Sequence, residues 1–522
     1  MKMHILDVLG LIVYFGGIAA MGVYFSRKNV NTEEYFVGGR SFSGLVIGLS
    51  LVGTGISSVT FLAYPADAFK VSWIRYLPNL MMPLAVLSAA YYFLPFFRRG
   101  KITTAYEYLE KRFGVSVRLY GSASYIIRGL IRISIMLYLV SIVFHEITGL
   151  SLALCIILFG IFVIFYTVLG GIDAVIWTDV AQTIVLLGGG ILCLGVIAYE
   201  LPGGFGQIFS GAIEHGKLSF SELVNGELRP IDWKLSLGDK TGSMMLLFGL
   251  TIWLTHYSSE QATIQRYCAS RSAHEARKGM FYVVVASLPI WALFMFLGTS
   301  LFVFFQTFPT AESAAMLSGE MKAEHILPHF IIDYLPPGFS GLVIAAALAA
   351  AMSSLDSVIN AISTVVTVDF VKPHILKGRT DKQYLRLAQI FAFAAGTIMI
   401  LGALLLLISE TKTLEHTALV LASIVISGRL GLYMLGFFTT VGDARAAWVG
   451  LSCTLLFTLW TILAKSGLLP LAISPPFDLY YTSIVGNIIM FTVGFLTAKI
   501  IPAKTRDLTN LSFWTQDGTP LQ

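Results

Sequence analysis

The 522-residue chain is 56% hydrophobic and only 12% charged, whereas a typical soluble domain is about 25% charged. Apolar runs of about 20 residues recur from end to end, which excludes a soluble globular protein and predicts an all-α integral membrane protein with one membrane domain. The net charge of +5 is small and scattered, so it gives no indication of a nucleic-acid partner.

The apolar runs divide the chain into about thirteen predicted transmembrane helices. In chain order they cover residues 5–25, 43–65, 72–97, 119–147, 151–169, 174–200, 243–264, 280–306, 338–369, 387–408, 415–440, 446–464 and 478–501. Lysine and arginine gather on alternate connections, so the positive-inside rule places those connections in the cytoplasm and the N-terminus outside. We expect a monomeric, multi-pass protein of the plasma or inner membrane, in contact with the lipid bilayer.

The second predicted span is interrupted near its middle by Gly53 and Gly55. Ser57, Ser58 and Thr60 follow directly, which is typical of a helix that unwinds and exposes backbone carbonyls. Because irregular backbone at membrane depth must be covered by protein or water, such a break predicts a cavity. The alternative is that the small residues form a packing face for a neighbouring helix.

The fourth span carries Arg128 and Arg132, one helical turn apart. A guanidinium can bind a carboxylate through two parallel hydrogen bonds, so Arg132, the deeper of the two, is a candidate for binding an acidic solute. Arg128 could extend toward the cytoplasmic surface. The alternative for Arg132 is a structural ion pair with an acid such as Glu146 or Asp356.

Intramembrane acids and hydroxyls indicate a cation site. Ser353, Asp356 and Ser357 are three and four residues apart in the alanine-rich span 338–369, so they share one helical face, and Asp179 lies in the sixth span. A charge at bilayer depth costs about 2.5–3.5 kcal/mol, and a hard cation such as Na⁺ prefers oxygen ligands. Alternatively, the serines bond to their own helix and Asp356 forms a structural pair.

The seventh span turns polar from Thr255 to Glu260, which predicts a second broken helix. Two breaks in corresponding positions favour two inverted repeats of five helices each. His256 in this stretch can equally be a hydrogen-bonded core histidine, and Arg429 in the eleventh span either lines the cavity or extends to the surface, the latter being slightly favoured. The expected segments are 1–42, a first half 43–200, an extracytoplasmic loop 201–242, a second half 243–440 and a tail region 441–522.

Five stretches make the chain similar to a known family. Thr167 to Gln182 (TVLGGIDAVIWTDVAQ) resembles the signature of the sodium:solute symporter family, and so do Tyr35 to Phe69, Ile102 to Gly114, Gln261 to Tyr267 and Ala349 to Ser363. The stretches extend over most of the chain in the expected order. The resemblance implies a LeuT-like five-plus-five inverted-repeat fold with flanking helices, and Na⁺-driven uptake of a solute by alternating access.

The resemblance also implies positions for the ions and the solute. The main Na⁺ site would use the carbonyls of Gly53, Ile56 and Ala350 and the hydroxyls of Ser353 and Ser354. A second Na⁺ site, present in some members, would use Asp179, Ser353, Asp356 and Ser357. The solute candidates are Thr54, Ser57, Thr60, Asn79, Arg132 and His256. Asp356 stands where the bacterial sialic acid branch tends to have a hydroxyl, which leaves the number of bound ions open.

The expected function is therefore Na⁺-coupled symport of a small, anionic organic solute, with sialic acid as the leading candidate. A neutral sugar or another metabolite is the alternative within the same class. A passive channel belongs to a different class and would need a continuous polar path rather than polar residues at mid-depth. An enzyme is not expected, because the sequence contains neither an HExxH zinc motif nor a GxSxG nucleophile elbow.

Overall fold

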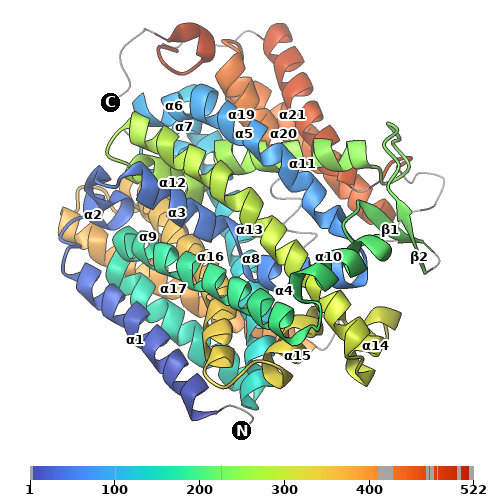
Figure 1. Ribbon diagram of the computed structural model, residues 1–522. Coiled ribbons are helices and arrows are strands. Elements are labelled where there is room, and N and C mark those ends of the chain that lie inside the picture. Colours follow the sequence, from blue (N-terminus) through green and yellow to red (C-terminus); the bar gives the residue numbers. More distant parts are fainter. Residues whose placement is uncertain are drawn as a thin grey trace.

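The computed structural model describes residues 4–99, 102–224, 226–409, 427–465, 470, 475–478, 480–501 and 507–516. Helices dominate this part of the chain (Figure 1). The first half contains α1 (Ile5–Ser26), α2 (Thr32–Val37), α3 (Gly44–Gly55), α4 (Ser58–Lys70), η2 (Trp73–Met81), α5 (Met82–Ser88), α6 (Leu94–Arg99), α7 (Ala105–Arg112), α8 (Val115–Thr148) and α9 (Leu152–Glu200). Together these elements cover the first six predicted spans.

After α9, α10 (Gly204–Glu214) leads into a hairpin of β1 (Ser221–Val224) and β2 (Glu227–Pro230). This hairpin projects from one side of the helical body (Figure 1). The remaining helices are α11 (Gly242–Ser259), α12 (Gln261–Ala269), α13 (Ala273–Thr307), α14 (Ala311–Ser318), α15 (Ile326–Asp333), α16 (Phe339–Val365), α17 (Asp381–Ser409), α19 (Arg429–Phe438), α20 (Ala444–Lys465) and α21 (Tyr480–Ile500). The first part of the predicted span 415–440 lies outside the described residues.

Among the described helices, nine are long and apolar enough to cross a membrane, or up to ten if the bent pair α3 and α4 counts as one span. Straight, the 49 residues of α9 would measure about 74 Å, more than twice the thickness of a bilayer core. Gly171 has a non-helical backbone (φ 57°, ψ −154°) and divides α9 in two. This kink lies between the predicted spans 151–169 and 174–200.

Both predicted helix breaks are present. Between α3 and α4, Ile56 and Ser57 are extended, and the two halves meet at a bend of 57°. Between α11 and α12, Glu260 alone is extended (φ −83°, ψ 120°). At each break the regular helical hydrogen bonds between residues i and i+4 stop. The carbonyl groups just before the break therefore have no N–H group of the same helix to bind.

Helix α16 lies at the centre of the molecule (Figure 1), and its residues from Val343 to Val365 are buried. Its alanine-rich face lets α9 approach closely, since a Cβ on Gly189 of α9 would lie 2.5 Å from the Cβ of Ala346. The N-terminus of α16 is capped from α1, where Asp7 Oδ1 accepts hydrogen bonds from the backbone N–H groups of Gly338 (2.7 Å) and Gly341 (2.9 Å). These contacts fix the position of α16 along its axis relative to α1 and α9.

Candidate functional site

The break after α3 faces the serines of α16. Ser353 Oγ lies 3.0 Å from the carbonyl oxygen of Gly53 and 3.3 Å from that of Ala350. Ser354 Oγ lies 3.5 Å from the carbonyl oxygen of Thr54. Because α3 ends at Gly55, its last carbonyls have no helical partners and can be shared with an ion. Gly53, Ala350, Ser353 and Ser354 of the predicted main Na⁺ site thus lie together at this break, and Ile56 is buried at the same break.

Asp179 of α9 lies beside this point and is held by an arginine. Its Oδ2 accepts hydrogen bonds from Ser50 Oγ (2.5 Å) and Arg266 Nη2 (2.6 Å), and Arg266 Nη2 also donates to Ser357 Oγ (2.6 Å). The Arg266 guanidinium thus lies between two residues predicted for the second Na⁺ site. Asp179 Oδ1 is buried and has no hydrogen-bond partner in the described part of the chain. Sequence reasoning missed Arg266, although it is the only charged residue of the quoted stretch QATIQRY.

Asp356 is turned toward a different set of hydroxyls. Its Oδ2 accepts from Tyr166 (2.8 Å) and Thr178 (3.4 Å) of α9, and its Oδ1 accepts from Ser357 (3.3 Å). Asp356 and Asp179 are both fully buried. Arg266 bonds directly to Asp179 and lies within electrostatic range of Asp356, so with both carboxylates ionised this buried group carries a net charge of −1. A buried net charge is costly unless a cation compensates it.

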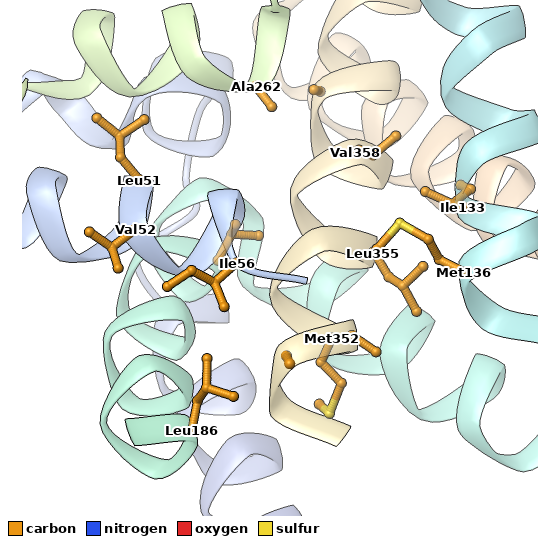
Figure 2. Close-up of a cluster of buried hydrophobic side chains, with 14 of the residues drawn as sticks. Leu51, Val52, Ile56, Ile133, Met136, Leu186, Ala262, Met352, Leu355 and Val358 are labelled. Carbon is orange, nitrogen blue, oxygen red and sulfur yellow. The ribbon is translucent and has the colours of Figure 1, made fainter. Parts of the chain in front are cut away.

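Buried apolar side chains of α3, α9 and α16, the helices that carry the polar cluster, pack together (Figure 2). They include Leu51 and Val52 of α3, Ile56 directly after α3, Leu186 of α9, and Met352, Leu355 and Val358 of α16. Electrostatic interactions are stronger in such surroundings than in water. With Asp179 and Asp356 both ionised, the polar cluster has one negative charge in excess, and a small cation bound close to it would compensate that charge.

The solute candidates on α3, α4 and η2 divide into two groups. The Thr54 hydroxyl lies 3.4 Å from both Asp179 Oδ2 and Ser357 Oγ, which places it with the ionic cluster. Ser57 is half-buried and Thr60 is buried, and a Cβ on Gly55 would meet open space. Asn79 donates to the hydroxyl of Tyr64 of α4 at 2.6 Å. The break therefore adjoins free volume at Gly55.

Arg132 of α8 is half-buried and, among the residues that the structure describes, forms no hydrogen bond or ion pair. The two acids considered as its structural partners are engaged elsewhere, Glu146 with His325 and Asp356 with Tyr166. His256 also remains a candidate solute residue, but its Nε2 lies 3.1 Å from Thr263 Oγ1 across the second helix break. Arg132 is thus available to an external anion.

The expectation for Arg429 was wrong, since this residue does not extend to the surface. Arg429 is buried and its Nη2 donates to Glu260 Oε2 at 2.5 Å. Arg128 is also drawn inward and donates to both oxygens of Glu260, at 3.2 and 2.9 Å. Sequence reasoning overlooked Glu260 as a hub, although its position at the polar end of the broken seventh span was a signal.

Comparison with known proteins agrees with this arrangement. The model of the family described as sodium:solute symporter matches residues 35–452. The sodium/sialic acid symporter SiaT of Proteus mirabilis is 31% identical over 515 residues, which is 97% of this chain and 98% of that protein. The sodium/sialic acid symporter NanT of Aliivibrio fischeri is 30% identical over 498 residues, which is 95% of this chain and 93% of that protein.

A solved structure described as the substrate-bound outward-open state of a Na⁺-coupled sialic acid symporter, revealing a novel Na⁺ site, matches with a TM-score of 0.85. It is 28% identical, and the match covers 96% of this chain and 99% of that one. The fold is that of an ion-coupled membrane transporter. The chain belongs to the sodium:solute symporter family, and Na⁺ is its coupling ion.

Proposed function

We propose that this protein imports sialic acid, or a closely related sugar acid, together with Na⁺ by alternating access. The two bacterial relatives are named as sialic acid symporters and span nearly the whole chain. The observation that carries the proposal is the guanidinium of Arg132, which is half-buried within the fourth span and has no partner among the described residues. Arg128, Arg266 and Arg429 each pair with a carboxylate, so Arg132 supplies the charge that a carboxylate solute needs.

The remaining solute candidates would contact other parts of such a molecule. Ser57 and Thr60 offer hydroxyls at the first break, Asn79 offers an amide, and His256 offers a ring nitrogen at the second break. Thr54 would act through the ion site, because its hydroxyl points to Asp179 and Ser357. A neutral sugar would use the same hydroxyls but would leave Arg132 without a partner.

Na⁺ would be held by the carbonyls of Gly53, Ile56 and Ala350 and the hydroxyls of Ser353 and Ser354. Two features support this assignment. Oxygens of Gly53, Ala350, Ser353 and Ser354 lie at the first break, and with Asp179 and Asp356 both ionised the adjacent buried group carries a net charge of −1. Bound there, Na⁺ supplies the missing positive charge and links α3 to α16. A second Na⁺ would use Asp179 Oδ1 together with Ser353, Asp356 and Ser357, on the side of Asp179 that Arg266 leaves free.

The proposed topology has thirteen spans, with the N-terminus outside the plasma or inner membrane. Residues 43–200 and 243–440 would form the two inverted halves, each beginning with a broken helix, and 201–242 the outer loop that contains the β hairpin. Residues 1–42 and 441–522 would flank them, and the transporter would act as a monomer. The basic connections support this orientation.

Uptake into proteoliposomes tests the proposal. With a Na⁺ gradient, the wild-type protein should accumulate radiolabelled sialic acid, whereas a K⁺ gradient should give none. Arg132→Ala should raise the KM for the acid about 10- to 100-fold, as expected for the loss of a hydrogen bond between charged groups worth about 1.5–3 kcal/mol. Arg27→Ala, at an exposed position directly after α1, serves as the control. Unchanged uptake by Arg132→Ala, or uptake of neutral sugars only, would overturn the assignment of a carboxylate solute.

A further inference from the structure

The cluster of Arg128, Glu260 and Arg429 has no role in the proposed function. Glu260 lies at the break between α11 and α12, Arg128 one turn before Arg132 on α8, and Arg429 at the start of α19. The side chains of Glu260 and Arg429 are only 5% and 6% exposed. In the proposed topology α8 begins on the cytoplasmic side, which places this cluster between Arg132 and the cytoplasm.

Glu260 occupies the position that a bound carboxylate would take. Arg128 Nη1 donates to both of its oxygens, and Arg429 Nη2 donates to Oε2. Two guanidiniums from different helices thus hold one carboxylate. Because the backbone of Glu260 is extended and interrupts the helix, this side chain lies on a discontinuous element rather than on a rigid helix.

The cluster also contains hydrogen-bonding groups that are not used. Arg429 Nε, the Tyr106 hydroxyl and the Tyr125 hydroxyl are buried without a partner in the part of the chain that the structure describes. The two tyrosine rings lie 6.0 Å apart, and both hydroxyls lie within electrostatic range of Arg429 and Glu260. Buried donors are nearly always satisfied, so their accumulation beside Glu260 indicates a ligand or ordered water.

The charge of the region favours an anion. Arg132 lies within electrostatic range of Glu260, so Arg128, Arg132 and Arg429 contribute three positive charges against one negative charge, a net charge of +2. One incoming carboxylate would reduce this excess. Arg132 lies four residues after Arg128, which corresponds to a helix rise of about 6 Å. A carboxylate that leaves Arg132 can therefore reach Arg128 in one movement.

We propose that Arg128, Arg429, Tyr106 and Tyr125, here named the inner station, form a second carboxylate-binding subsite. The station receives the carboxylate of the solute after Arg132, on the way to the cytoplasm. Glu260 holds the two arginines in the arrangement seen here and is displaced when the solute arrives. This inference rests on the proposed function, because it requires an acidic solute.

Transport kinetics measured separately at the two membrane faces test the inner station. In oriented proteoliposomes, the double variant Tyr106→Phe/Tyr125→Phe removes both hydroxyls and keeps the rings, so the packing of α7 against α8 is preserved. We expect the KM for sialic acid presented to the cytoplasmic face to rise about tenfold, a loss of about 1.4 kcal/mol, while the KM at the outer face changes less than twofold. Tyr138→Phe, also on α8 and half-buried, is the matched control and should change neither value.

Glu260→Gln should act in the opposite direction. Without the resident carboxylate, both guanidiniums become available to the solute, so the KM at the cytoplasmic face should fall and turnover should slow because release is delayed. Equal changes at the two faces in the tyrosine variant, or no change at either, would overturn the station and leave the proposed function standing. A wild-type protein that transports a neutral solute and no carboxylate would overturn both.

Discussion

Arg266 determines the electrostatics of the proposed ion site. Its guanidinium is buried and bonds to Ser50, Asp179 and Ser357 at once. It pairs with one of two buried carboxylates, and when the other is ionised its charge would attract Na⁺ in surroundings that screen charge poorly. We therefore expect the affinity for Na⁺ to depend on Arg266 as well as on the proposed oxygen ligands.

The contribution of a single oxygen ligand can be measured at Ser353. Ser353→Ala removes the hydroxyl next to the Gly53 and Ala350 carbonyls, so we expect the Na⁺ concentration for half-maximal uptake to rise about tenfold, or about 1.4 kcal/mol. Thermal stabilisation of purified protein by Na⁺ relative to K⁺ should fall in parallel. Ser340→Ala, on the same helix but at an exposed hydrogen bond, is the control. An unchanged Na⁺ response would remove Ser353 from the site.

At the scale of the element, the two broken helices and α16 form one functional unit. The first break supplies carbonyls to the serines of α16, and the second break places Glu260 between arginines of α8 and α19. Both breaks put polar backbone at mid-depth, which a bilayer tolerates only inside protein or beside water. The position of α16 along its own axis therefore decides whether its serines face the first break.

Substitution of Asp7 tests how α16 is held in position along its axis. Its carboxylate caps the N-terminus of α16 from another helix and also favours the positive end of the helix dipole. Asp7→Ala should destabilise the protein by about 1–2 kcal/mol and raise the Na⁺ concentration needed for uptake, because α16 is no longer held at its outer end. The melting temperature in detergent and Na⁺-dependent uptake check this together. Asp7→Asn keeps the acceptor oxygen and should retain most of the stability; an equal loss in both variants would contradict the capping role.

At the scale of the whole molecule, side chains distant in sequence join the two proposed halves at the surface as well as at the centre. His325, in the connection between α14 and α15, lies with its Nδ1 3.1 Å from Glu146 Oε1 at the end of α8. The hydrogen bond with Glu146 raises the pKa of His325 above its ordinary value. Both side chains are about one-third exposed, so solvent weakens their interaction.

This pair predicts a pH dependence of stability. Because the pKa of His325 is higher in the folded protein than in the unfolded chain, where it is about 6.5, the pair stabilises the fold fully below that value. Its contribution is lost as the pH rises through the folded-state pKa. His325→Gln should therefore lower the melting temperature slightly at pH 5.5 and have no effect at pH 8.5. The exposed His374 provides the control variant His374→Gln, and an equal effect of His325→Gln at both pH values would disprove the linkage.

The sequence by itself determined the membrane class, the helical architecture, the family and the positions of both helix breaks. These properties follow from local signals: apolar runs of spanning length, glycines and polar residues at mid-depth, and hydroxyls at helical spacing around Asp356. The same signals led to the predicted roles of the α16 serines and of Arg132, which has no partner among the described residues. The described residues bear out the breaks at Gly55 and Glu260 and the proximity of Ser353 to Gly53.

Only the tertiary structure decided how the buried charges are paired. The partners of Asp179 and Glu260 come from other helices, with Arg266 and Arg429 lying 87 and 169 residues away in sequence. Helical periodicity shows which residues share one face of a helix. It does not show which other helix, or which face of that helix, packs against this face. For this reason Arg429, which the sequence favoured as a surface anchor, instead neutralises a carboxylate at the second break, and Arg266 occupies a place that the sequence left to an ion.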